Sequence, residues 1–174
     1  MSNESGQTRT QTSWLERIRQ HINGFPGYEN PENRLREDAR FRQYLGQLSA
    51  ETMARVEQLV RSAANEKRLD LLSDFEHMLS ALQRFREFTE NPPKALDNTT
   101  VVAADLLTEW HRKDSEYLEC LSAFSDRVEQ LHGPVPERND VLLLLDTLDR
   151  LMQRIRERDQ RGGETGVTGE AEDD

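Results

Sequence analysis

Residues 30–63 read NPENRLREDARFRQYLGQLSAETMARVEQLVRSA, and this stretch decides the fold of the chain. Its apolar residues recur at steps of three and four, which is the spacing of one helix face and not of a strand. Pro31 suits the first helical position, and Glu29 and Glu32 suit the positive end of the helix dipole. The sequence therefore predicts a helix about 50 Å long, with the stripe Leu35, Ala39, Phe41 or Arg42, Leu45, Leu48, Met53, Val56, Val60 and Ala63.

Four more helices are predicted from the same spacing. They cover residues 13–23, 69–91, a stretch from 98–100 to 131, and a stretch from 137 or 139 to 160. Gly24, Pro92, Gly133 and Gly162 stand near the ends of these helices, where glycine and proline commonly stop a helix. The predicted core stripes of the three long ones are Leu69, Leu72, Phe75, Leu79, Leu82 and Phe85; Ala103, Leu106 or Leu107, Trp110, Tyr117, Leu121, Phe124, Val128 and Leu131; and Val141, Leu144 or Leu145, Leu148, Leu151 or Met152 and Ile155.

The join between the second and third helices has two interpretations. No Gly or Pro lies between Arg61 and Arg68, so one continuous helix through residues 30–91 would keep its apolar stripe nearly in phase. A turn at residues 65–68 is favoured, because a helix of about 60 residues is rare in a chain of this size. Asn65 also tolerates the left-handed conformation that often ends a helix.

These elements predict an all-α fold, an antiparallel bundle of four long helices with a short amphipathic helix at the N-terminal end. The bundle covers residues 13–161, and polar or acidic composition predicts disorder in residues 1–12 and 162–174. Asp114 falls on the apolar stripe between Trp110 and Tyr117. Either the helix turns this carboxylate aside, or the seam has a polar gap there.

Composition narrows the class of protein. The 174 residues carry a net charge of -10, five of the acids lie in residues 162–174 without a Lys or Arg, and 34% of residues are hydrophobic. We expect a thin core, a tail that serves solubility or contacts a basic partner, and no binding to nucleic acid. One cysteine, no signal-peptide pattern in residues 1–19 and a longest apolar run of five residues favour a cytoplasmic protein without a membrane-spanning helix.

Chemical motifs are scarce. Glu129 and His132 have the Glu-x-x-His spacing of di-iron bundles, and Asp74 and His77 give an Asp-x-x-His variant. Both pairs lie beside the predicted core stripes instead of on them, so a metal site is the less favoured hypothesis, and no cofactor and no catalytic residue are predicted. Cys120 is expected to be an inert, buried thiol.

The short N-terminal helix carries the predicted interaction residues. Its apolar face could bind a membrane surface, dock a partner chain or cap the core of the bundle, and the last is favoured because Arg17 and Arg19 are its only basic residues. The face consists of Trp14, Leu15, Ile18, Ile22 and Phe25. The leading hypothesis is a non-catalytic protein that acts through protein–protein contacts or self-association, as an adaptor, scaffold or oligomer subunit. A di-iron-like metal bundle and a peripheral membrane protein are the alternatives.

Residues 24–45 carry a further pattern, namely a Pro-Gly-Tyr turn followed by a Glu/Arg-rich helix: Pro26, Gly27, Tyr28, Glu32, Arg34, Arg36, Asp38, Arg42 and Leu45. This pattern resembles the opening of a family of uncharacterised bacterial helical proteins, and residues 69–74 resemble that family's next helix. The resemblance covers residues 14–88, lacks a second Gly-Tyr pair after Tyr28, and implies no activity. From the residues themselves, Asp38 and Arg42 form an i,i+4 pair, and Tyr28 is expected to pack the turn onto the bundle.

Overall fold

The computed structural model describes residues 14–91, 103–131 and 135–162, with side chains in the last range up to Arg154. Within these ranges the chain forms helices and no strand, which confirms the all-α prediction. A short N-terminal helix covers residues 14–21. The four long helices are α2 (Pro31–Asn65), α3 (Leu69–Glu90), α4 (Ala104–Gln130) and α5 (Arg138–Gly162).

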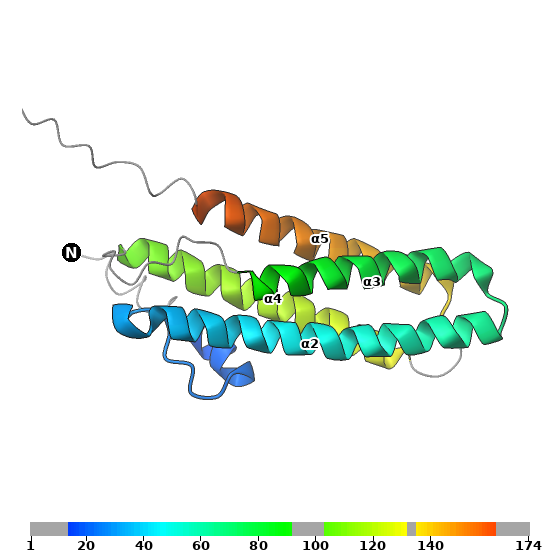
Figure 1. Ribbon diagram of the computed structural model, residues 1–174, viewed down its shortest axis with the longest axis horizontal. Helices are drawn as coiled ribbons and strands as arrows, with labels where there is room; N and C mark the ends of the chain where they lie inside the picture. The colour runs from blue at the N-terminus through cyan, green and yellow to red at the C-terminus, as the bar shows by residue number, and fades with distance from the viewer. Residues whose placement is uncertain (1–13, 92–102, 132–134, 163–174) are drawn as a thin grey trace, which may run out of the picture.

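The four long helices form one elongated bundle (Figure 1). Successive helices are antiparallel, so α2 and α4 run in one direction and α3 and α5 in the other. α2 packs against α3 and α4, and α5 packs against the same two helices. The order around the bundle is therefore α2, α3, α5, α4. As a result α2 and α4 are parallel neighbours that begin at the same end, and α3 and α5 are parallel neighbours that begin at the opposite end.

Helix ends follow the predicted signals closely. Pro31 is the first residue of α2, and the Asn30 side chain caps it by accepting a hydrogen bond from the Glu32 N–H at 3.0 Å. α3 ends at Glu90, immediately before Asn91 and the two prolines. α5 spans Arg138–Gly162, within two residues of the prediction at its C-terminal end.

The chain does turn between α2 and α3, so the continuous-helix alternative is wrong. The Arg68 N–H donates to the Ala63 carbonyl at 2.8 Å, and the Lys67 N–H donates to the Ala64 carbonyl at 3.1 Å. This pair of bonds is a Schellman motif, which requires a left-handed residue just after the helix. Lys67 takes that conformation with φ 60, whereas Asn65 is still helical. The prediction of the turn is confirmed, and its assignment to Asn65 is corrected.

Buried residues of the long helices recur mainly at steps of three and four. In α3 the buried side chains include Leu71, Phe75, Met78, Leu82 and Phe85. The predicted stripe is wrong at two exposed leucines, Leu35 of α2, which is 44% exposed, and Leu69 of α3, which is 70% exposed. It is also wrong at Ala39 of α2, which is exposed. Leu69 is the first residue of its helix, and Leu35 is displaced because the first turns of α2 bury polar side chains.

The burial of α4 shows which of the two alternatives for Asp114 holds, a side chain turned aside or a polar gap in the seam. This carboxylate is fully buried, so the seam has a polar gap, and His111 one turn earlier is buried beside it. Ala103, predicted in the core, is exposed and is the N-cap of α4. The predicted start of this helix at residues 98–100 and its end signal at residues 132–133 lie outside the described residues. So do the predicted disordered ends at residues 1–12 and 162–174, except for Gly162, which is the last residue of α5 and corrects the prediction at that position. None of the described helices is both long enough and apolar enough to span a membrane.

Candidate functional site

A buried polar cluster lies at the end of the bundle where α2 and α4 begin. We call Tyr28, Arg34, His111 and Asp114 the Tyr28 cluster; each of these residues is 2% exposed or less. Arg34 belongs to the first turn of α2, His111 and Asp114 belong to α4, and Tyr28 belongs to the connection before α2. A polar group in such a position must find hydrogen-bond partners, because unpaired burial is costly.

Tyr28 uses its backbone and its side chain together. Its hydroxyl donates to Asp114 Oδ2 at 2.6 Å, and its N–H donates to His111 Nε2 at 3.2 Å. Its carbonyl accepts a hydrogen bond from Arg34 Nε at 3.1 Å. The Tyr28 ring stacks on the His111 ring with centroids 5.2 Å apart, and Phe25 and Trp110 meet it edge-on. The prediction that Tyr28 packs the turn onto the bundle is confirmed.

The glycine before Tyr28 is required by this geometry. Gly27 has φ +94, a conformation that side chains with a Cβ rarely adopt. A Cβ at this position would lie 3.1 Å from His111 Nε2 and would also meet the carboxylate of Glu29. The backbone of Gly27 therefore approaches the imidazole more closely than any other residue type would allow.

His111 is held as a neutral imidazole. Its Nε2 accepts the Tyr28 N–H, so the ring proton lies on Nδ1, which is 3.9 Å from Glu29 Oε1. Burial lowers the pKa of His111 below its usual value, Glu29 and Asp114 act in the opposite direction, and Arg19 adds to the lowering. The cluster thus contains a buried proton acceptor that is already engaged in a hydrogen bond.

A buried ion pair continues the polar region along α2. Arg42 Nε donates to Asp38 Oδ2 at 2.7 Å, and both side chains are buried. The same guanidinium donates to the Phe88 carbonyl at 3.3 Å and lies over the Phe88 ring, with 5.0 Å between Cζ and the centroid. The predicted i,i+4 pair is confirmed, and its burial makes the loss of either partner far more costly than at a surface.

Further contacts fasten residues 14–30 to the bundle. Arg17 forms an ion pair with Glu119 of α4 at 3.1 Å, and both side chains are exposed. Arg40 of α2 donates to the Gly24 carbonyl at 3.4 Å and also to the Asn23 carbonyl. Within the segment, Arg19 Nε donates to the Phe25 carbonyl at 2.7 Å. The segment is therefore attached by buried hydrogen bonds at Tyr28 and by exposed ones elsewhere.

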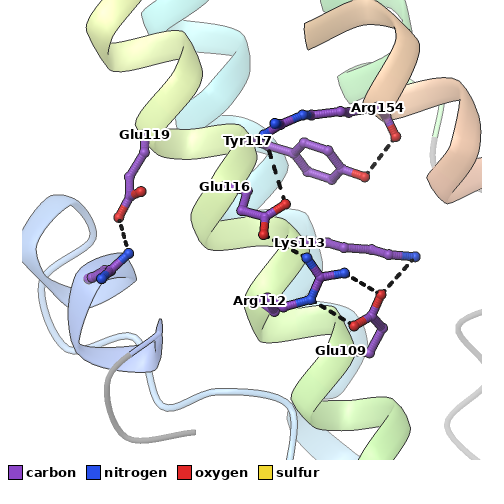
Figure 2. A network of polar contacts seen from close by, with 8 residues as sticks. Glu109, Arg112, Lys113, Glu116, Tyr117, Glu119 and Arg154 are labelled. Atoms are coloured by element: carbon purple, nitrogen blue, oxygen red, sulfur yellow. Dashed lines mark hydrogen bonds and ion pairs between the residues drawn. The ribbon is translucent and has the colours of Figure 1, made fainter. Parts of the chain in front are cut away.

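The outer face of α4 carries a network of charged side chains (Figure 2). Arg112 pairs with both Glu109 and Glu116 at 2.6 Å, and Glu116 lies 3.8 Å from Arg154 of α5. The hydrogen bonds with Arg112 lower the pKa of Glu109, and the same contacts raise the pKa of Arg112. The Tyr117 hydroxyl donates to the Arg154 carbonyl at 2.9 Å. These groups bind one another and join α4 to α5.

Three residues of the metal hypothesis lie in the described part of the chain, and each contacts a charged or titratable side chain of another helix. Glu129 lies 3.7 Å from Arg55, Asp74 lies 3.5 Å from Arg138, and the exposed His77 lies 3.5 Å from Asp149. His132 lies outside the described residues. In the part of the chain that the structure describes, no three or more His, Cys, Asp or Glu side chains gather where they could hold a metal ion.

The predicted interaction face of the short helix is largely in the core. Ile18, Ile22 and Phe25 are buried, and Trp14 and Leu15 are half-buried. This burial supports the favoured interpretation, in which the face caps the bundle. Binding of these five residues to a partner chain or a membrane surface stays a prediction. The Cys120 thiol, predicted to be buried and inert, is half-buried. Burial raises the pKa of this thiol, whereas the positive charges of Arg154 and Arg150 act to lower that pKa. Such a thiol is mainly protonated and weakly reactive at neutral pH.

His111 was not singled out by sequence reasoning as a member of a site, although a signal for it exists. It lies three residues before Asp114, and both keep the three-and-four spacing of Leu107, Leu118 and Leu121. Two polar residues in the seam of one helix indicate that a polar partner from elsewhere in the chain is buried against them. Here that partner is Tyr28.

The chain matches none of the protein-family models, curated proteins or solved structures with which it was compared.

Proposed function

We propose that this chain is a non-catalytic helical protein that acts through protein–protein contacts, and that its first partner is a second copy of itself. One observation carries the proposal. Three leucines at one end of the bundle are exposed although they belong to well-formed helices: Leu69 at 70%, Leu142 at 44% and Leu143 at 48%. Exposed apolar side chains that share one end of a bundle are candidates for an interaction surface.

The three leucines lie at the same end of the molecule because α3 and α5 are parallel neighbours (Figure 1). Asp70 and Arg138 lie close enough to interact, since Arg138 contributes to the lowered pKa of Asp70, whose main cause is the hydrogen bond from Arg68. Arg138 also forms an ion pair with Asp74 at 3.5 Å. We call Leu69, Leu142 and Leu143 the leucine patch.

Charges of both signs lie near the leucine patch in the sequence. Arg68, Asp70, Glu137 and Arg138 lie at the starts of the two helices. A two-fold symmetric contact places the same surface on both partners, so a surface of mixed charge can pair with itself. A strongly basic or strongly acidic partner would meet repulsion from half of these groups. This mixture favours a second copy over a highly charged partner.

The contact is expected to be weak. Three leucine side chains fall short of the roughly 800 Å² per partner that a stable interface buries. Sedimentation velocity over a wide range of protein concentration tests this. We expect the average mass of the wild-type protein to rise with concentration, and the triple variant Leu69→Gln/Leu142→Gln/Leu143→Gln to remain a monomer.

The matched control is Leu35→Gln, because Leu35 is as exposed as Leu142 but lies at the opposite end of the bundle. This variant should associate like the wild type. A wild-type protein that stays monomeric at every concentration, or a triple variant that associates unchanged, would contradict the proposal.

The same proposal includes coiled-coil packing of the helices, a cytoplasmic location, a bacterial origin and a role for the acidic tail. The three-and-four spacing of the buried residues supports coiled-coil-like packing of the long helices. A single cysteine among 174 residues supports a cytoplasmic location. The resemblance of residues 14–88 to bacterial helical proteins supports a bacterial origin, and an acidic tail at residues 162–174 would keep a weakly associating protein in solution.

A further inference from the structure

We propose that residues 14–30, the N-terminal segment, form a proton-sensitive latch on the bundle, and that protonation of His111 at Nε2 opens it. The inference goes beyond the proposed function and concerns the opposite end of the molecule from the leucine patch. It rests on the hydrogen bond that the Tyr28 backbone N–H donates to the imidazole ring of His111, which can be protonated.

The geometry at Nε2 admits only one proton donor. The Tyr28 N–H already donates to this atom at 3.2 Å, so a proton added there would face a second N–H across the same short distance. The rings of Tyr28 and His111 are stacked with an interplanar angle of 7°, and the Gly27 backbone lies close beside the imidazole. The ring therefore has little room to turn away while the segment stays bound.

His111 is faced by charged or titratable groups from the N-terminal helix, from the connection before α2, from α2 and from α4 itself. Glu29 of the connection lies 3.9 Å from Nδ1, and Asp114 is on the same helix one turn later. Arg19 belongs to the N-terminal helix, and Arg34 of α2 reaches the cluster through the Tyr28 carbonyl. The two carboxylates favour the protonated ring, whereas burial and Arg19 disfavour it, and burial is the largest of these effects.

The sign of the pH dependence follows from this balance. The pKa of His111 is lowered while the segment is bound, and it returns toward the ordinary value of 6.5 when the segment opens. The bound segment is therefore most stable above about pH 6.5, and its stability falls with pH down to the lowered pKa. Between these two pH values the equilibrium constant for opening rises up to about tenfold per pH unit.

The remaining attachments allow the segment to open as a unit. The ion pair of Arg17 with Glu119 and the hydrogen bonds from Arg40 are exposed to solvent. The two other hydrogen bonds of Tyr28, to Asp114 and from Arg34, are buried, and they break when the segment opens. The buried apolar contacts of Ile18, Ile22 and Phe25 oppose opening and keep the segment bound at neutral pH. Opening would uncover these three side chains together with the face of the bundle beneath them.

Hydrogen exchange followed by mass spectrometry on the full chain tests the latch. Exchange is measured at pH 7.5, 6.5 and 5.5 at low protein concentration and is corrected for the intrinsic effect of pH. We expect protection of residues 14–30 to fall below pH 6.5, while protection of residues 71–85 in α3 stays constant. Unchanged protection of residues 14–30 down to pH 5.5 would overturn the proposal.

Three variants identify the group that titrates. His111→Gln keeps an acceptor side chain but does not titrate, so its protection of residues 14–30 should not change between pH 7.5 and 5.5, whatever its starting level. His77→Gln removes an exposed histidine of α3 and should respond to acid like the wild type. An acid response that persists in His111→Gln, or disappears in His77→Gln, would overturn the assignment.

Glu29→Gln provides a second test in a protein that should fold normally, because the Glu29 side chain is exposed. Removing this carboxylate removes a charge that favours protonated His111. The loss of protection should therefore move to lower pH. A shift to higher pH would overturn the electrostatic argument. Since exchange is measured on the monomer, failure of the latch and failure of self-association remain distinguishable.

Discussion

At the end of the bundle where α3 and α5 begin, the buried side chains are mainly apolar, and Leu71, Phe75, Phe124 and Val128 are fully buried there. At the end where α2 and α4 begin, the interior holds Arg34, Asp38, Arg42, His111 and Asp114 beside apolar side chains such as Phe25 and Phe41. One chain with one helical architecture thus uses two kinds of interior. The stability of the apolar interior depends on filled volume and buried apolar area. The stability of the polar interior depends on the direction of hydrogen bonds and ion pairs, since each polar group must meet its partner.

The two ends should respond differently to substitution. Apolar burial is non-directional, so a replacement of similar volume costs little and a cavity costs a great deal. In a polar interior, removal of one partner leaves the other without its bond, whereas removal of both can be nearly neutral. The following predictions test this difference, beginning with the largest effect.

Phe124→Ala tests the apolar end. Phe124 is fully buried in α4, and replacing it by alanine should lower the free energy of unfolding by about 4 kcal/mol. Phe124→Leu is the matched control, and it should cost about 1 kcal/mol because most of the volume is kept. Urea denaturation measures both. Equal costs for the two variants would show that the apolar end is not packed as described.

Arg42→Met tests the polar end. Methionine keeps the length of the side chain but leaves the Asp38 carboxylate, 2.7 Å from Arg42 in the wild type, buried without this guanidinium. The free energy of unfolding should fall by about 3 kcal/mol. The double variant Asp38→Leu/Arg42→Met should recover most of that loss. If the two single losses simply add, the ion pair is not the reason for the cost.

Gly27→Ala separates backbone strain from contact with the Tyr28 cluster. Both Gly24 and Gly27 have positive φ, +69 and +94, but a Cβ at Gly24 meets nothing within 4 Å, whereas one at Gly27 meets His111 Nε2 at 3.1 Å. Gly24→Ala should therefore cost about 1 kcal/mol from strain alone, and Gly27→Ala about 2 kcal/mol or more. Thermal unfolding and hydrogen exchange of residues 14–30 compare the two. Equal losses of stability and protection in the two variants would show that steric contact with the Tyr28 cluster adds nothing to the cost of a Cβ at residue 27.

The same contrast explains what could be predicted from the sequence. The bounds of α2 and α3, the turn between them and the stripe through Phe75 and Leu82 follow from periodicity, Pro31 and the prolines after Asn91. Periodicity detects apolar side chains, so it misplaced the first turns of α2, where Arg34 and Asp38 are buried and Leu35 is exposed. A buried polar residue can be recognised only with its partner, and these partners lie far apart: 86 residues separate Tyr28 from Asp114.

Lys67→Gly gives the smallest expected effect and tests backbone conformation at the apolar end of the bundle. Lys67 has φ 60 in the Schellman motif, a position that glycine occupies without a Cβ penalty. Relief of that strain, offset by the greater freedom of glycine in the unfolded chain, should raise the free energy of unfolding by about 0.5 kcal/mol. Lys67→Ala keeps the Cβ and should change the stability little, because the side chain is exposed. If alanine stabilises the protein as much as glycine does, the loss of the lysine charge and not the backbone conformation would be the cause.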